Sequence, residues 1–151
     1  MRQAVSNVDP SACHCTGLKK ASRRVSLFYD RYLAPCGLTS GQFAILAAIA
    51  SWPGGQSPPL GELARTLAMD RAALTHTLKP LVREGLIEFG RDARDGRARL
   101  VKLTHGGSQR LGEARPLWIA AQGCFAKTFG ENQAIALRAL LRVVTDTTLG
   151  D

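Results

Sequence analysis

The order of secondary-structure signals between Leu60 and Leu103 is the feature that most constrains the fold of this chain. Two segments with the apolar spacing of helices come first, and two short strand-like segments follow, at Leu86–Gly90 and Arg99–Leu103. The loop between the strand-like segments is dense in charge and contains Asp95-Gly96, a pair typical of hairpin turns. This order predicts a mostly α-helical fold with one small β-hairpin.

The second helix of this pair is predicted to begin after Asp70 and to run to about Glu84. Asp70 is a favourable N-cap because its carboxylate accepts hydrogen bonds from free backbone amides and complements the helix dipole. Gly85 is expected to end the helix in the left-handed conformation. Pro80 lacks a backbone donor and is expected to bend the helix or to break it into two turns.

The polar side of this helix has the chemistry of a DNA-reading surface. An α-helix fits the major groove, and side chains near its N-terminus reach base edges. An arginine there can bond a guanine edge, an alanine can touch a thymine methyl group, and a lysine further along finds phosphate. The alternative is an ordinary amphipathic helix with a solvated face. The candidate residues on this helix are Asp70, Arg71, Ala72, Thr75, His76 and Lys79.

Four arginines lie on or beside the predicted hairpin, at Arg91, Arg94, Arg97 and Arg99. A hairpin tip can approach the minor groove, where arginine is drawn to negative potential. Asp95 is expected to hold a neighbouring arginine in position, and Arg97 is the candidate for insertion into the groove. Together with the net charge of +8, these arginines favour nucleic acid over an anionic membrane as the partner.

The segments on either side of this region predict further helices. Thr39 and Gln42 form a capping box that opens a helix through about Ala50. The apolar end segments are a plausible dimerisation layer, and the alternative is that they complete a monomeric core. The expected division is a disordered N-terminus at 1–10, an N-terminal dimerisation helix at 11–38, a helix-turn-helix with its hairpin at 39–103, and C-terminal dimerisation helices at 104–151.

The last part of the chain is predicted to contain two helices. Thr104 is the expected cap of the first, and Gly130 separates it from the second. Gly106, Gly107 and Pro116 are expected to fray the start of the first helix and to kink it.

Several segments together resemble the MarR (multiple antibiotic resistance regulator) family, over roughly Leu18 to Val144. The resemblance implies a triangular homodimer of winged helix-turn-helix subunits, joined by their N- and C-terminal helices. It also implies binding to a pseudo-palindromic DNA operator, usually as a repressor that a small ligand or oxidation releases. The matching segments are Leu38–Phe43, Leu60–Ala64, Met69–Arg71, Leu78–Leu81, Gly85–Ile87, the D-x-R-D-x-R signature at Asp92–Arg97, and Leu103–Gly107.

By residue matching, Asp95 and Arg97 take the wing roles of the family, and Asp70–Lys79 takes the role of the recognition helix. The chain departs from the family at Ala72-Ala73, where a hydroxyl residue followed by Thr is frequent, and at His76, where Arg is frequent. These departures leave the base contacts and the operator sequence open.

The resemblance also implies an effector pocket between the dimer layer and the DNA-binding lobe. An aromatic acid or a phenolic compound would suit such a pocket, with Arg23 or Arg24 pairing a carboxylate. The alternative is that the aromatic side chains are core residues. The candidate ligand-binding residues are Arg23, Tyr29, Tyr32, Phe43 and Trp52.

Thiol chemistry is a second possible input. Cys13-His14-Cys15 places two thiols and an imidazole together near the start of a helix, where a thiol pKa is lowered. These residues could start a metal site, but one chain offers no complete set of four ligands, so no metal is expected unless a symmetric dimer pools ligands. The alternative is that Cys13 and Cys15 are small packing residues, as Cys36 and Cys124 are expected to be.

Other functional classes are less well supported. No nucleophile motif surrounds the cysteines and histidines, and no phosphate-binding glycine-rich loop is present, so neither an enzyme nor a cofactor is expected. The first ten residues lack the apolar run of a secretory signal, which predicts a cytoplasmic protein without a membrane partner. A winged fold that binds another protein, with the basic wing as a solvated surface, is the alternative from a different class.

Overall fold

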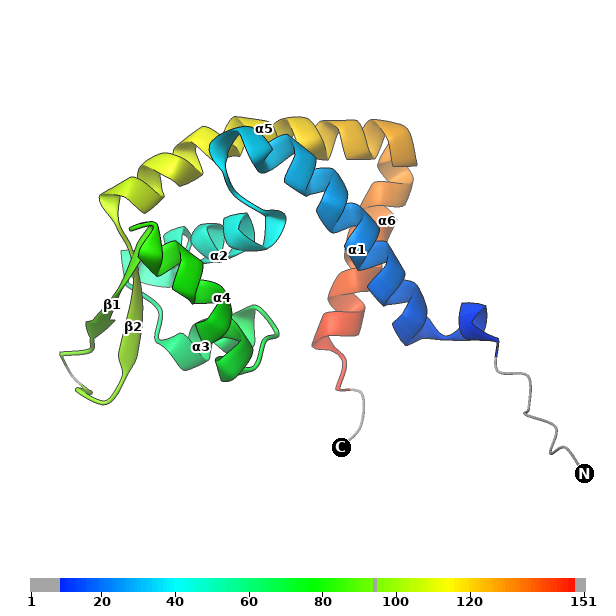
Figure 1. Cartoon of the computed structure of the whole chain (residues 1–151). Coiled ribbons are helices and arrows are strands. Elements are labelled where there is room, and N and C mark those ends of the chain that lie inside the picture. Colours follow the sequence, from blue (N-terminus) through cyan, green and yellow to red (C-terminus); the bar gives the residue numbers. More distant parts are fainter. Residues whose placement is uncertain (1–8, 94, 149–151) are drawn as a thin grey trace, which may run out of the picture.

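The computed structural model describes residues 9–93 and 95–148. Figure 1 shows α5 along one side, α2, α3, α4 and the hairpin beneath its N-terminal end, and α1 and α6 near its C-terminal end. The fold class predicted from the sequence is confirmed. The helices and strands are α1 (His14–Leu33), α2 (Ser40–Ala50), α3 (Leu60–Thr66), α4 (Arg71–Arg83), β1 (Ile87–Arg91), β2 (Arg99–Leu103), α5 (His105–Phe129) and α6 (Glu131–Asp146), with 3-10 turns at Pro10–Ala12, Ala34–Cys36 and Pro53–Gly55.

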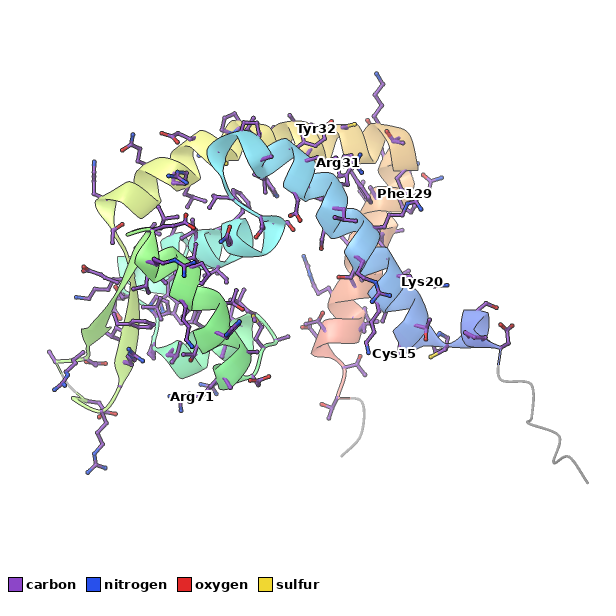
Figure 2. All side chains as sticks on the ribbon, in the orientation of Figure 1. Cys15, Lys20, Arg31, Tyr32, Arg71 and Phe129 are labelled. Carbon is purple, nitrogen blue, oxygen red and sulfur yellow. The ribbon has the colours of Figure 1, made fainter. Side chains whose placement is uncertain are left out.

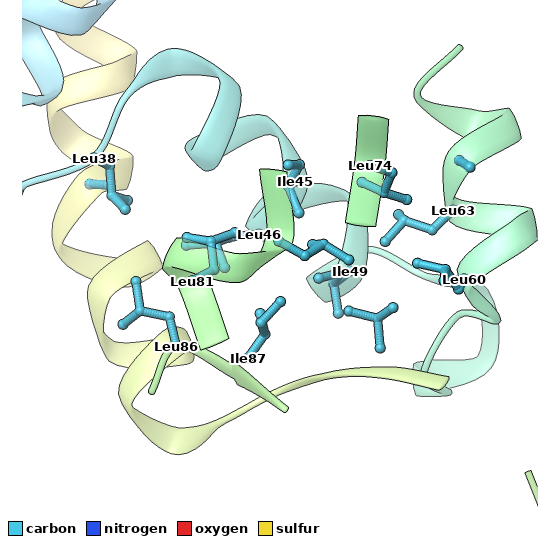
Figure 3. Packing of buried hydrophobic residues seen from close by; sticks show 14 of the residues in the cluster. Leu38, Ile45, Leu46, Ile49, Leu60, Leu63, Leu74, Leu81, Leu86 and Ile87 are labelled. Atoms are coloured by element: carbon cyan, nitrogen blue, oxygen red, sulfur yellow. The ribbon is translucent and has the colours of Figure 1, made fainter. Parts of the chain in front are cut away.

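The hydrophobic core lies where α2, α3, α4 and the hairpin meet (Figure 3). Leu46 of α2, Leu63 of α3 and Leu74 of α4 have no solvent-exposed surface. Each such side chain contributes roughly 1.5–3 kcal/mol by leaving water. Because the leucine stripe of α4 is buried in this core, the opposite face of the helix is turned to solvent.

The local signals read from the sequence are present. The Thr39 hydroxyl accepts from the Gln42 amide at 3.2 Å, and the Thr39 amide donates to the Gln42 side chain at 3.0 Å, so the capping box is complete. Gly85 has a φ of +70° and ends α4, as predicted. The Leu86 amide then donates to the Leu81 carbonyl at 2.9 Å, which satisfies the last turn of the helix.

Pro80 does not break α4, which runs as one helix to Arg83. Proline removes one donor, the one that would reach the carbonyl four residues earlier. The turn beyond it remains closed, because the Glu84 amide donates to the Pro80 carbonyl at 2.9 Å. The predicted break is therefore wrong, and the bend that was the other expected outcome stays a prediction.

The start of α5 is not frayed, and Gly107 is the reason. Gly107 is buried against the end of α4, and a Cβ atom there would overlap the Leu86 carbonyl oxygen. Thr104 closes the same junction, because its hydroxyl accepts from the Gly107 amide at 2.9 Å and donates to the Gly85 carbonyl at 2.6 Å. The glycine that was expected to weaken the helix instead allows α5 to pack directly on the turn before β1.

The C-terminal helices leave apolar surface uncovered in a single chain. On α6, Leu140 is 64% exposed and Val143 is 61% exposed. Leu27 of α1 and Ile119 of α5 are also more than half exposed. Among the described residues no single helix is both long and apolar enough to cross a membrane, and only a pair bent by 73°, His14–Cys36 with Ser40–Ala50, meets that criterion by length and composition.

Gly107→Ala is expected to lower the free energy of unfolding by about 1–3 kcal/mol, because the added methyl group must displace the Leu86 backbone. Urea unfolding followed by circular dichroism measures this loss. Gly106→Ala is the matched control, since its Cβ would lie 3.5 Å from the Gly85 carbonyl oxygen, an ordinary contact. Equal stability of the two variants would contradict the close packing at this junction.

Candidate nucleic-acid interface

The turn between α3 and α4 sets the direction of α4. Ala68 has a φ of +51°, a left-handed conformation that is uncommon for a residue other than glycine. The Met69 amide then donates to the Ala64 carbonyl at 2.9 Å, and Asp70 follows as the N-cap. The Asp70 carboxylate accepts from the Ala73 amide at 2.7 Å, as predicted from the sequence. The tight turn and the cap together place the N-terminus of α4 at the surface.

The outer face of α4 carries most of the residues predicted to read DNA. Arg71, Ala72, His76 and Lys79 are exposed, while Thr75 is half-buried. The Thr75 hydroxyl donates to the Arg71 carbonyl at 2.7 Å, so its proton is used within the helix and its oxygen is left as an acceptor. Figure 2 shows Arg71 at the edge of the lobe, on the side away from α5.

Asp95 holds the hairpin turn by accepting hydrogen bonds from two backbone amides. Its carboxylate accepts from the Arg97 amide at 3.0 Å, and its carbonyl accepts from the Ala98 amide at 2.9 Å. Asp95 therefore positions Arg97 through the backbone and leaves the guanidinium exposed to solvent. Arg94, the other predicted wing arginine, lies outside the described residues.

The register of the hairpin adds two arginines to the candidate site. Arg91 pairs directly with Arg99 across the strands. The Arg99 guanidinium carbon lies 3.8 Å from the centre of the Phe89 ring, so this cation is stacked. A hollow of about 610 Å³ opens here, with Arg91, Arg97 and Arg99 in its wall and no carboxylate among its lining residues. The sequence places these arginines on or beside the hairpin, but only the strand register shows that Arg91 and Arg99 face each other.

Like charges directly across a hairpin are destabilising unless a counter-charge lies near them. The two ion pairs seen among the described residues, Arg65 with Glu62 and Arg110 with Glu113, both lie outside this surface. Among the described residues, a set of exposed cations is thus open to an anionic partner: Arg91, Arg97 and Arg99 on the hairpin, and Arg71 and Lys79 on the outer face of α4.

The residues predicted to form an effector pocket do not line one common cavity. Phe43 stacks on Trp118 with ring centres 5.8 Å apart, and it packs against the core. Trp52 is half-buried before the 3-10 turn at Pro53–Gly55. The exposed Arg23 lies in a shallow hollow on α1. Phe43 is thus used for packing in the single chain, and the effector role of these residues stays a prediction.

The two tyrosines of the predicted pocket have different surroundings. The Tyr29 hydroxyl donates to the Gln122 side chain at 2.7 Å, and Tyr29 lines a cavity between α1, α5 and α6. Tyr32 instead packs on Phe28, with ring centres 5.2 Å apart, and contacts Cys124, which raises the pKa of Tyr32. Of the predicted ligand residues, only Tyr29 lines this cavity.

Cys13 is the N-cap of α1. Its sulfur accepts from the Thr16 amide at 3.5 Å, and hydrogen bonds from Thr16 lower the pKa of the Cys13 thiol. Cys13 and Cys15 are both exposed in the single chain. Cys36, in contrast, donates to the Leu33 carbonyl at 3.0 Å. No group of three potential metal ligands occurs among the described residues.

Comparison with known proteins gives a family match over α2, α3, α4 and β1, which include most of the candidate interface. A sequence model of the MarR family matches residues 37–98. The transcriptional activatory protein BadR of Rhodopseudomonas palustris is 33% identical over 96 residues, which are 63% of this chain and 51% of BadR. This chain thus spans about half the length of that relative.

Two solved structures cover nearly the whole fold. The Mycobacterium tuberculosis regulator MosR in complex with DNA is 31% identical, with a TM-score of 0.70 over 85% of this chain and 98% of MosR. The repressor CouR bound to a 23-mer DNA duplex is 27% identical, with a TM-score of 0.77 over 89% of this chain and 93% of CouR.

Asp70→Ala is expected to lower the free energy of unfolding by about 0.5–2 kcal/mol, because the Ala73 amide loses its acceptor. Asp70→Asn is the matched control, since asparagine caps helices about as well while removing the charge. Urea midpoints of both variants measure the difference. If Asn and Ala lower the midpoint equally, the charge of Asp70 matters and its hydrogen bond does not.

Proposed function

This chain belongs to the MarR family, and we propose that it is a homodimeric transcriptional regulator, not an enzyme, that binds a pseudo-palindromic operator in double-stranded DNA. The observation that carries the proposal is the set of open cations on the outer face of α4 and on the hairpin. MosR and CouR, which share this fold, have been solved with DNA bound. We propose that this regulator acts as a repressor.

In the proposed complex α4 enters the major groove. Arg71, near its N-terminus, is the candidate for a bidentate contact to guanine, and His76 and Lys79 reach a base edge or phosphate. Arg97 at the hairpin enters the adjacent minor groove. Arg91 and Arg99, directly opposite each other where the two strands meet the connecting loop, would bind backbone phosphate, whose charge relieves their repulsion.

The proposed homodimer follows from the uncovered apolar surface on the terminal helices. Leu140 and Val143 of α6 would be shielded by a second copy of the chain, together with exposed apolar residues of α1 and α5. A two-fold axis would present two copies of α4 to half-sites about 10 bp apart. The charge of +8 per chain is doubled in such a dimer.

Release of the DNA by a small aromatic or phenolic ligand is the proposed form of regulation. The cavity beside Tyr29 supports it, because it is mostly apolar and of a size that suits a small molecule.

Thiol-based sensing is the second candidate, and the position of Cys13 favours it. The lowered pKa of the Cys13 thiol raises its thiolate fraction at neutral pH. A peroxide would transfer one oxygen to this thiolate to form a sulfenic acid and water or an alcohol. Condensation with the Cys15 thiol would then form a disulfide and release a second water.

We expect affinity for a DNA duplex of about 30 bp to fall steeply with salt, because bound phosphates release counterions. Arg97→Ala should weaken binding by about 1–3 kcal/mol. Arg31→Gln is the matched control, since Arg31 is also exposed but lies far from Arg71 (Figure 2). Fluorescence anisotropy over a range of salt concentrations measures both, and sedimentation gives the number of chains bound.

A weak affinity that is insensitive to salt and equal in the Arg97 and Arg31 variants would instead support a winged module that binds protein. A single chain bound to one half-site would contradict the homodimer.

For the thiol proposal, peroxide should release DNA from the wild type but not from Cys13→Ser or Cys15→Ser. Cys36→Ser is the control, because serine can keep the hydrogen bond to the Leu33 carbonyl. Release in all three variants would show that the thiols at the start of α1 are not the sensor. Anisotropy with and without a reductant measures the effect.

A further inference from the structure

The two faces of the hairpin formed by β1 and β2 carry different kinds of side chain (Figure 1). Side chains alternate between the faces of a strand, and residues paired across two strands share a face. On one face Phe89 pairs with Val101, which is fully buried. The next pair on this face is Arg91 with Arg99, and both are exposed. The face of the hairpin that packs on the core therefore ends in two cations.

The other face of the hairpin carries both signs of charge. Glu88 pairs with Lys102 across the strands, so opposite charges face each other there. The Lys102 side chain also lies over Gly90, where a Cβ atom would come 2.6 Å from its Cε atom. The unbalanced positive charge of the paired strands therefore lies on the core-side face, at Arg91 and Arg99.

The second edge of β2 is also held in place. The Val101 amide donates to the Pro58 carbonyl at 2.9 Å, and Pro59 pairs with Leu100 in an antiparallel bridge. Pro58 itself is fully buried. Arg99 thus comes directly before a segment that is tied both to β1 and to the loop preceding α3. The backbone of Arg99 is therefore fixed relative to the lobe that carries α4.

Phe89 holds the other end of Arg99, its guanidinium. The Phe89 ring is partly buried and packs against the core. The guanidinium carbon of Arg99 lies 3.8 Å from the centre of this ring. A planar guanidinium stacks well on an aromatic face, and its N–H groups point outward in its own plane. Arg99 can therefore bind an anion while the stacking on Phe89 remains intact.

We propose that Phe89 is a positioning residue for DNA binding, which acts through Arg99. Its ring holds the guanidinium in place before DNA arrives, so that Arg91 and Arg99 can bind one backbone phosphate together. All three residues line the same hollow of about 610 Å³. A side chain that is already held loses less rotamer freedom on binding than a free one. This role rests on the proposed DNA binding, and it requires no contact between Phe89 and DNA.

The test is fluorescence anisotropy of the full chain with a mixed-sequence DNA duplex of about 30 bp, since phosphate contacts carry no sequence information. Phe89→Leu keeps an apolar side chain against the core but removes the ring. It should weaken binding about two- to tenfold, because the released Arg99 must be ordered on binding. The salt dependence should stay as in the wild type, since no cation is removed. Phe89→Tyr, which keeps the ring, should bind as the wild type does.

A second background separates positioning from a role in the fold of the hairpin. Arg99→Gln should weaken binding and also lower the salt dependence, because a phosphate contact is lost. Adding Phe89→Leu to this variant should have no further effect, since no guanidinium is left to position. Lys102→Gln is the matched control, because it removes a cation from the opposite face and should weaken binding less than Arg99→Gln.

An equal loss of affinity on Phe89→Leu with and without Arg99 would overturn the proposal, and so would wild-type affinity in Phe89→Leu. If circular dichroism shows that Phe89→Leu does not fold, Arg99→Lys decides, since it keeps the charge and leaves Phe89 in the core. It should weaken binding without changing the salt dependence, because an ammonium does not stack as a planar group; wild-type affinity there would overturn the proposal. Salt-dependent binding of the wild type distinguishes a failure of this role from a failure of the DNA-binding proposal.

Discussion

The close contact between Gly107 and the Leu86 carbonyl is the constraint on which the rest of the structure depends. At this point the end of α4, the start of β1 and the first turn of α5 meet without an intervening side chain. Thr104 ties the three together through hydrogen bonds to the Gly107 amide and the Gly85 carbonyl. Because the contact is between backbones, it gives little room for α4 and the hairpin to rotate relative to α5.

Much of this architecture could be predicted from local sequence. The Thr39 capping box, the Asp70 cap and the left-handed Gly85 depend on neighbours within a few residues, and all three are present. The hairpin could be predicted for the same reason, since Asp95-Gly96 forms a turn through its own backbone. The outer face of α4 then follows from the leucine spacing that buries its other side.

The parts that could not be predicted depend on contacts between residues far apart in the chain. Both Phe43 and Tyr29 are predicted as pocket residues, yet Phe43 stacks on Trp118 while Tyr29 lines a cavity and bonds Gln122. Which aromatic ring faces a cavity is decided by where α5 and α6 pass, and no local pattern encodes this. The sequence predicts that Gly107 frays the start of α5 for the same reason. Only the folded chain brings the Leu86 carbonyl beside this glycine.

The charges of the hairpin raise a question of stability, since Arg91 and Arg99 face each other. Stacking of Arg99 on Phe89 offsets about 0.5–1 kcal/mol of this repulsion at an exposed site. Asp95 holds the tip because its carboxylate accepts from the Arg97 amide and its carbonyl accepts from the Ala98 amide, so the hairpin does not need a side-chain ion pair at Arg97 to keep its shape. An ion pair there would stabilise the free protein, but it would have to be broken before an anion could bind. Backbone contacts and stacking instead hold the arginines in place while leaving their charge available, and an anionic partner would then stabilise the folded chain by mass action.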